Sequence, residues 1–170
     1  MAAQVIRKKI VLVGDKKTGK TAFVKKIKTG EFEPVYVATL GVEVQPVQMD
    51  DYLLNIWDCA GDERFMGIAD GYYIKAEGAI IMLQDYESAL IAKEYADKIT
   101  EVAGEIPMVF VGNKADQDQL PNDFASGDYP YLKLSTRDDT REDLKSALQA
   151  LIGHFDDESD PVEHEIPIAD

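Results

Sequence analysis

The residues best suited to chemistry in this sequence form a glycine- and lysine-rich loop near the N-terminus. Residues 14–21 are Gly-Asp-Lys-Lys-Thr-Gly-Lys-Thr, which matches the phosphate-binding pattern G-x-x-x-x-G-K-[ST], called the P-loop below. Such a loop turns backbone N–H groups toward a polyphosphate, and the helix behind it adds the positive end of its dipole. We expect Lys20 to reach the β and γ phosphates and Thr21 to offer its hydroxyl to Mg²⁺. The residues expected to line this phosphate site are Asp15, Lys16, Lys17, Thr18, Gly19, Lys20, Thr21 and Ala22.

A second segment carries the residues needed to recognise a guanine base. Asn113-Lys114-Ala115-Asp116 follows the apolar run Met108–Val111 and matches N-K-x-D. The Asp116 carboxylate can accept two hydrogen bonds, from N1 and N2 of guanine, whereas adenine has no such donor pair and would leave the carboxylate desolvated and unpaired. We expect the Lys114 stem to pack along the base and Asn113 to brace the loops around it. The pattern alone is common by chance, but its place after a buried strand and downstream of a P-loop makes it informative.

A third segment predicts the metal and γ-phosphate contacts. Asp58-Cys59-Ala60-Gly61 matches D-x-x-G and ends an apolar run. We expect Asp58 to hold Mg²⁺, usually through water, and the N–H of Gly61 to contact the γ phosphate, although an aspartate here can also simply cap a turn. Thr39, in the loop after the first helix, can complete the Mg²⁺ shell only when a γ phosphate is present, so nucleotide state would control this loop. In the same loop, Phe32 could stack edge-on against guanine or be an ordinary core residue.

Alternating strands and helices must hold these loops in place. Short apolar runs predict strands, and apolar residues at helical spacing predict helices. The expected strands are Lys9–Val13, Val42–Met49, Leu53–Trp57, Gly78–Leu83, Met108–Val111 and Tyr131–Leu134. The expected helices are Thr18–Thr29, residues 89–103, and a last helix that is capped by Asp139 or Thr140 and carries an apolar stripe to Phe155. This order predicts an α/β fold with a mostly parallel six-stranded sheet, helices on both faces and one antiparallel edge strand, with ligands bound at the carboxyl ends of the strands.

Composition favours a single acidic domain. The chain has 170 residues, 45% of them apolar, and a formal net charge of −14. The negative charge argues against direct binding to nucleic acid or anionic membranes, and no apolar run approaches the roughly 20 residues of a membrane span. Residues 1–155 are predicted to form the folded domain. Residues 156–170, with seven acidic side chains and no Lys or Arg, are predicted to form an acidic C-terminal tail. The lone cysteine, Cys59, can form no internal disulfide, and the terminal Ile-Ala-Asp carries no prenylation site.

Taken together, the motifs resemble those of the Ras-like small GTPases and, among them, the Ran family. Residues 29–33 (Thr-Gly-Glu-Phe-Glu) and 36–44 (Tyr-Val-Ala-Thr-Leu-Gly-Val-Glu-Val) are similar to the first switch of Ran. Residues 70–74 (Asp-Gly-Tyr-Tyr-Ile) are similar to the segment after its second switch, and the runs Ala79–Met82 and Gly112–Lys114 also fit. The resemblance is good through the N-K-x-D segment and weak beyond it. The acidic tail and the missing prenylation site are Ran-like as well.

The resemblance implies a P-loop NTPase fold of the G-domain type and a switch that binds GTP and GDP with Mg²⁺, hydrolyses GTP and moves between nucleus and cytoplasm. Ran-like proteins load or unload nuclear transport receptors according to the bound nucleotide. The implied partners are therefore transport receptors and an exchange factor or activator, and we expect a monomer with no membrane anchor. The residues that match the nucleotide site of the family are Lys20, Thr21, Phe32, Tyr36, Thr39, Asp58, Gly61, Asn113, Lys114, Asp116, Ser135, Thr136 and Arg137, with Thr21, Thr39 and Asp58 as metal ligands.

The sequence departs from that family where hydrolysis takes place. Lys16-Lys17 replaces Gly-Gly, and the first lysine is expected to crowd the space beside the γ phosphate, although its ammonium could instead neutralise phosphate charge as an activating arginine does. Asp62 replaces the glutamine that orients the attacking water, and phosphate would repel its charge unless an ion pair with Lys16 or Lys17 compensates it. We therefore expect slow hydrolysis, with Lys20, Gly61 and Asp62 as the catalytic residues.

Two further departures concern the base side of the site. Ser135-Thr136-Arg137 stands where the family has S-A-K, and the change to Arg137 is expected to have little effect. Residues 115–131 are rich in turn formers, so the helix that the family has there is expected to be shortened or lost. A basic cluster that Ran uses in partner contacts is also missing from this stretch.

Two functions follow from these observations. The leading hypothesis is a guanine-nucleotide switch with slow GTP hydrolysis. The alternative is a non-hydrolysing interaction module that stays in one nucleotide state, which Lys16, Lys17 and Asp62 favour. A P-loop kinase is disfavoured because N-K-x-D recognises guanine and the sequence has no evident lid for a second substrate.

Overall fold

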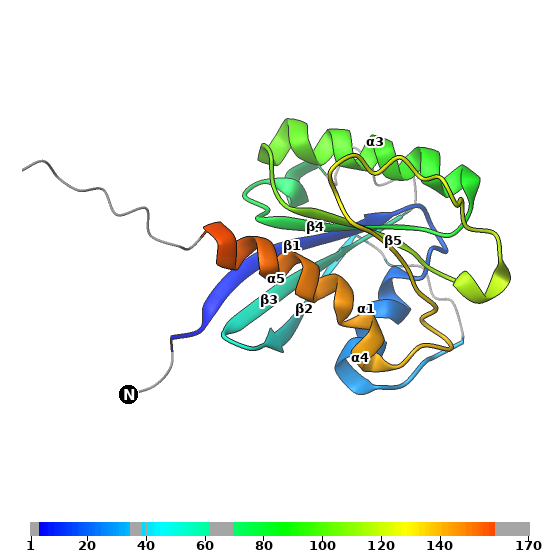
Figure 1. The fold of residues 1–170 in the computed structure, drawn as a ribbon. Helices are drawn as coiled ribbons and strands as arrows, with labels where there is room; N and C mark the ends of the chain where they lie inside the picture. Colours follow the sequence, from blue (N-terminus) through cyan, green and yellow to red (C-terminus); the bar gives the residue numbers. More distant parts are fainter. Residues whose placement is uncertain (1–3, 35–38, 40, 62–69, 159–170) are drawn as a thin grey trace, which may run out of the picture.

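The computed structural model describes residues 4–34, 39, 41–61 and 70–158. Within these residues the chain forms a six-stranded sheet with helices on both faces (Figure 1). The strands are β1 (Ile6–Gly14), β2 (Val42–Met49), β3 (Tyr52–Cys59), β4 (Gly78–Leu83), β5 (Met108–Gly112) and β6 (Tyr131–Lys133). The helices are α1 (Lys20–Thr29), α3 (Tyr86–Ala103), α4 (Arg141–Leu144) and α5 (Ser146–Glu158), with 3₁₀ turns η2 (Asp70–Tyr73) and η3 (Ala115–Gln117).

The strand order brings the three motif segments to one edge of the sheet. The order is β2-β3-β1-β4-β5-β6, with β2 antiparallel to β3 and the other neighbours parallel, which confirms the predicted topology. Near the carboxyl end of β1, Leu12 pairs with Asp58 of β3. Farther along the sheet, Leu83 of β4 pairs with Gly112 of β5. The D-x-x-G segment therefore begins beside the P-loop, and the N-K-x-D segment begins at the same end of the sheet, with β4 between β1 and β5. Ligands of such sheets bind at this end, next to the strand from which the connections diverge.

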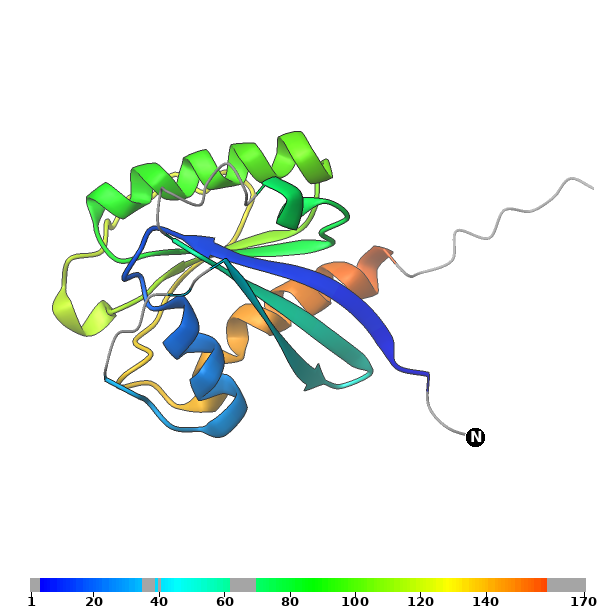
Figure 2. The same cartoon turned by 180° about the vertical axis from the view of Figure 1, so that it is seen from behind.

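Alternate residues of β1 face two apolar cores, one on each side of the sheet. Ile10 and Leu12 belong to the core that α1 and α5 cover. Val11 and Val13 belong to the core that α3 covers. Figures 1 and 2 show α3 on one face of the sheet and α1, α4 and α5 on the other. Because helices cover both faces, the central strands are continuous apolar runs, and the predicted arrangement is confirmed.

Most element boundaries lie within a few residues of the predicted ones. β4 has the predicted bounds, and α1 ends before Gly30, whose φ of 80° closes the helix. The helix α3 begins earlier than predicted because Asp85 and Ser88 form a capping box at its start. It ends at Ala103, the last residue of the predicted range, and Gly104 caps it.

The last helix is divided in two. Thr140 caps α4 in a capping box with Asp143, as one of the two predicted caps. The helix then breaks at Lys145 and resumes as α5, which the apolar stripe alone did not indicate. Between η3 and β6 the described residues contain no helix, which agrees with the prediction that a helix there is shortened or lost. No helix in the described part of the chain is long and apolar enough to cross a bilayer.

Candidate nucleotide-binding site

Two glycines fix the path of the P-loop between β1 and α1. A Cβ added to Gly14 would lie 2.4 Å from the carbonyl oxygen of Met82, and one added to Gly19 would lie 2.4 Å from Nδ2 of Asn113. Gly19 also has a φ of 92°, which residues with a side chain rarely adopt. The glycines of the motif are therefore required by packing against β4 and the N-K-x-D segment.

Lys20 is held inside the loop by backbone oxygens. It is 7% exposed, and its Nζ donates to the carbonyl oxygens of Gly14 and Asp15, at 2.9 Å each. Burial lowers the pKa of Lys20 to about 8, although the nearby Asp58 and Asp15 carboxylates act in the opposite direction. A polyphosphate bound beside this ammonium would favour its charged form. The lysine therefore lies where the motif requires it for contact with phosphate.

Three oxygen-bearing side chains meet near Lys20. The hydroxyl of Thr21 donates to Oδ2 of Asp58 at 2.6 Å, and it lies 2.8 Å from Oγ1 of Thr39. Asp58 is fully buried, and its Oδ1 has no hydrogen-bond partner among the described residues. Burial raises the pKa of the Asp58 carboxyl, while the hydrogen bond from Thr21 and the charge of Lys20 oppose that rise.

These side chains fit a bound magnesium ion. Oxygen ligands are those that Mg²⁺ prefers, and it keeps several positions for water and substrate phosphates. The unpaired Oδ1 of Asp58 is a buried acceptor that a cation would satisfy. Thr21, Thr39 and Asp58 are thus the residues that would hold the ion, directly or through water, and its chemistry there would be to offset phosphate charge.

The N-K-x-D segment is bonded directly to the P-loop. Nδ2 of Asn113 donates to the carbonyl oxygen of Thr18 at 2.8 Å, and Nζ of Lys114 donates to that of Lys17 at 2.6 Å. On its other side, Oδ1 of Asn113 accepts from the N–H and the hydroxyl of Thr136, at 3.0 and 2.9 Å. Asn113 therefore joins the P-loop to the loop after β6, which is the bracing contact expected from the sequence.

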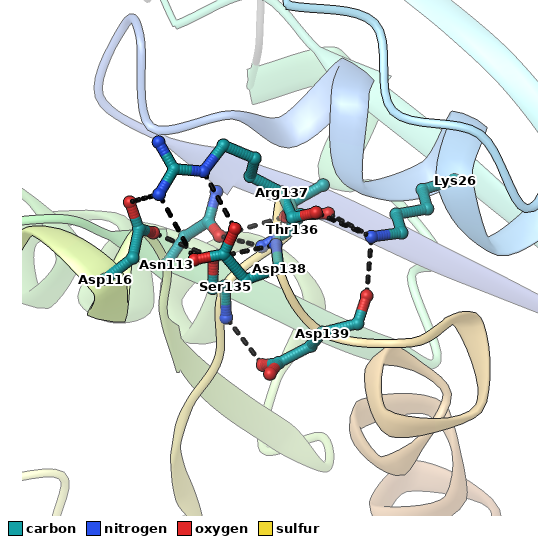
Figure 3. A network of polar contacts seen from close by, with 8 residues as sticks. All are labelled: Lys26, Asn113, Asp116, Ser135, Thr136, Arg137, Asp138 and Asp139. Atoms are coloured by element: carbon teal, nitrogen blue, oxygen red, sulfur yellow. Dashed lines mark hydrogen bonds and ion pairs between the residues drawn. The ribbon is translucent and has the colours of Figure 1, made fainter.

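Asp116 lines a pocket of about 570 Å³ between the P-loop and the loop after β6. Its side chain is 12% exposed, its Oδ1 accepts from the hydroxyl of Ser135 at 2.7 Å, and its Oδ2 lies 3.0 Å from Nη2 of Arg137 (Figure 3). The other residues that line the pocket are Lys17, Gly19, Ala22, Phe32, Glu33, Pro34, Asn113, Lys114, Gln117, Thr136 and Arg137. A pocket of this size suits a small ligand such as a nucleoside.

Phe32 lies at the pocket, and Gly61 lies against the P-loop. Phe32 is half-buried and lines the pocket, and its contact with a base stays a prediction. A Cβ on Gly61 would lie 2.6 Å from Nζ of Lys20 and 2.7 Å from the backbone nitrogen of Lys16. The D-x-x-G segment is therefore packed against the P-loop, and a side chain at Gly61 would collide with it.

Lys16 and Lys17 are exposed, and they differ in backbone conformation. Lys17 has a φ of 63°, in the left-handed region that glycine adopts more easily. The backbone N–H of Lys16 donates to Oδ1 of Asp15 at 2.8 Å. Asp62 and Tyr36 lie outside the described residues, so the Lys–Asp62 ion pair and the nucleotide contact of Tyr36 stay predictions.

Sequence reasoning missed Lys26 and the contact made by Arg137. Lys26 is 7% exposed, and its Nζ donates to the carbonyl oxygens of Thr136, Arg137 and Asp139 (Figure 3). The available signal was its spacing of three residues from Phe23, which places a lysine on the apolar stripe of α1. Arg137 was expected to have little effect, but its guanidinium forms an ion pair with Asp116, whose carboxylate is predicted to recognise guanine.

The site has three parts: a loop that is shaped for phosphate, an oxygen cluster suited to Mg²⁺, and a carboxylate in a nucleoside-sized pocket. Together they place the chain in the class of P-loop nucleotide-binding domains. The family model described as Ras of Complex, Roc, domain of DAPkinase matches residues 9–116, more than half of the chain. The chain belongs to this Roc family of GTPase domains within the Ras superfamily. Membership confirms the predicted P-loop GTPase fold and implies a guanine nucleotide, usually with Mg²⁺. The matched residues include the P-loop and the D-x-x-G and N-K-x-D segments.

Proposed function

We propose that this chain is a GTP- and GDP-binding switch that hydrolyses GTP slowly in the presence of Mg²⁺. The observation that carries the proposal is the bonding of Asn113 and Lys114 to P-loop carbonyl oxygens, at 2.8 and 2.6 Å. This bonding makes one continuous site, with the Asp116 carboxylate at the base end and the buried Lys20 at the phosphate end. A guanine nucleotide has the complementary groups in the same order.

The residues of the site favour GTP hydrolysis, but at a low rate. Lys20 and the N–H of Gly61 would stabilise the negative charge that develops on the γ phosphate, and Asp58 would help to hold Mg²⁺ beside it. Asp62, in place of glutamine, would orient the attacking water poorly. Lys16 would crowd the space beside the γ phosphate that glycine leaves free in relatives. We therefore propose a rate below that of a glutamine-bearing relative.

The finer part of the proposal is a Ran-like role in nucleocytoplasmic transport. Its support is the similarity of residues 29–33 and 36–44 to the first Ran switch, together with the acidic residues 156–170. We propose a monomer that moves between nucleus and cytoplasm and binds transport receptors, with an exchange factor or activator controlling its nucleotide state. The loss of a helix and of basic residues between 115 and 131 would remove part of the partner surface that Ran has.

A second candidate function is a non-hydrolysing interaction module that keeps one nucleotide and acts through its surface. Lys16, Lys17 and Asp62 favour it, because none of them is a residue that relatives use for catalysis at these positions. The two candidates share the nucleotide site and differ in one measurable step, the release of phosphate from bound GTP.

Nucleotide competition and single-turnover hydrolysis test both candidates. GTP and GDP should displace a fluorescent GDP analogue from the purified chain and ATP should not, because adenine has no donor pair for Asp116. Slow, Mg²⁺-dependent phosphate release that Asp62→Gln accelerates would support the switch, whereas GTP retained without release would support the module. ATP that binds as tightly as GTP, or binding of neither, contradicts the proposal.

A further inference from the structure

The guanidinium of Arg137 lies between two carboxylates at the mouth of the base pocket. Its Nη2 is 3.0 Å from Oδ2 of Asp116 (Figure 3). Its Nε and Nη2 donate to the two oxygens of Asp138, at 2.9 and 3.2 Å. The side chain of Arg137 is 58% exposed, whereas that of Asp116 is 12% exposed. An exposed arginine is thus held against a largely buried carboxylate by a second, neighbouring acid.

Arg137 offers Asp116 one N–H donor, at Nη2, of the same kind as the donors on the edge of guanine that Asp116 is proposed to recognise. In guanine, N1–H and N2–H are attached to a single carbon and lie in one plane. In arginine, the N–H groups are also attached to a single carbon and lie in one plane. Oδ1 of Asp116 already accepts from Ser135 at 2.7 Å, and Oδ2 is the oxygen that Arg137 approaches. Guanine therefore needs an oxygen that Arg137 already contacts.

We propose that Arg137 is an intramolecular competitor of guanine at Asp116 and thereby sets the affinity of the site for guanine nucleotides. This inference rests on the proposed function and adds a residue that controls it. Guanine must displace the guanidinium from Asp116, and Asp138 then keeps the displaced group nearby, so Arg137 can return when the base leaves. Adenine, which lacks the donor pair, cannot displace it, so the competition weakens guanine binding without admitting ATP.

Affinity measurements on two Arg137 variants test the proposal. Arg137→Lys keeps the charge and loses the planar fork of donors, and Arg137→Gln loses both. Lys133→Gln is the matched control, because it removes an exposed positive charge from β6. Among the described residues, Nζ of Lys133 donates to Oδ1 of Asn122, at 2.9 Å. The readout is the dissociation constant for a fluorescent GDP analogue with Mg²⁺, at low and high salt, with an ADP analogue measured in parallel.

We expect Arg137→Gln to bind the GDP analogue about twofold to fivefold more tightly than the original chain, as fits the loss of an ion pair with one exposed partner. Arg137→Lys, which keeps the charge, should gain less. The gain should shrink in high salt, which screens that pair, and binding of the ADP analogue should stay weak. Lys133→Gln should bind GDP as the original chain does. Unchanged or weaker GDP binding in the Arg137 variants overturns the inference alone, as does an equal gain in Lys133→Gln. Failure of the original chain and all variants to bind guanine nucleotides would refute the proposed function as well.

Discussion

Replacing Lys26 by methionine should destabilise the fold and loosen the base pocket. The ammonium of Lys26 comes from α1 and donates to the carbonyl oxygens of Thr136 at 2.6 Å, Arg137 at 3.1 Å and Asp139. At 7% exposure, little water is available to replace it. Methionine keeps a stem of similar length on the apolar stripe of the helix but leaves three carbonyl oxygens without this donor.

The expected loss follows from two opposing contributions. A hydrogen bond to a charged group contributes about 1.5–3 kcal/mol, but the variant no longer has to desolvate a buried ammonium, so we expect a net loss of about 2–3 kcal/mol in the free energy of unfolding. For a domain of this size such a loss lowers the melting temperature by roughly 5–10 °C. The same loop carries Ser135 and Thr136, which bond to Asp116 and Asn113. If about 1.4 kcal/mol of the loss falls on that loop, GDP affinity should drop about tenfold.

Urea unfolding of the nucleotide-free chain, followed by circular dichroism, measures the first effect, and titration with a fluorescent GDP analogue measures the second. Lys28→Met is the matched control, because Lys28 lies on the exposed face of α1 and its Nζ contacts the side chain of Gln45 at 2.8 Å. That variant should change the free energy of unfolding by less than about 0.5 kcal/mol. Equal unfolding midpoints for Lys26→Met and Lys28→Met would show that the buried ammonium contributes nothing, and the reasoning would be wrong.

Three further predictions concern the site. Lys17→Gly should raise the free energy of unfolding in urea by up to about 1 kcal/mol. Glycine adopts the φ of 63° at this position without strain, and this gain exceeds the cost of a more flexible unfolded chain. A lower free energy of unfolding would contradict this prediction. Asp116→Asn should weaken GDP binding by about a hundredfold or more and favour xanthosine diphosphate, whose base offers one donor and one acceptor to an amide. If competition assays show the same preference for GDP over xanthosine diphosphate as in the original chain, the role of Asp116 is refuted. GDP binding should take up a proton near pH 8–9, because the pKa of Lys20 is lowered to about 8 without phosphate and rises beside a bound phosphate. The affinity for GDP should therefore fall as the pH rises through that range. Calorimetry in two buffers of different ionisation enthalpy would detect the proton uptake, and no uptake in that range would contradict the role of Lys20.

The strands of the sheet could be predicted from the sequence because most of them are marked by a local run of apolar residues. The run Gly78–Leu83 is apolar throughout since helices cover both of its faces, and its bounds were predicted without error. The start of β1 was not predicted, because Arg7 and Lys8 are polar and belong to the strand only through their pairing with Leu53 and Leu54 of β3. Such pairing is set by the whole sheet, and no local pattern encodes it.

The phosphate end of the site was predictable for a similar reason, whereas the contacts of Lys26 and Arg137 at the base end were not. The P-loop is a continuous segment whose glycines, lysine and threonine each have a role that spacing alone indicates. Lys26 is different, since its partner Thr136 is 110 residues away in the sequence. A lysine on an apolar stripe is unusual enough to be noticed, but only the fold identifies the carbonyl oxygens that bind it.

Lys26 and Arg137 act on the same loop, and the structure predicts opposite signs for their removal. Lys26 holds the backbone of the loop that presents Ser135 to Asp116, so its loss should weaken GDP binding. Arg137 contacts the carboxylate itself, so its loss should strengthen GDP binding. A general loosening of the loop would weaken binding in both variants, and a general change of charge would shift both in one direction, since each removes one positive charge. Opposite shifts in Lys26→Met and Arg137→Gln would therefore separate a residue that positions the base site from a residue that competes for it.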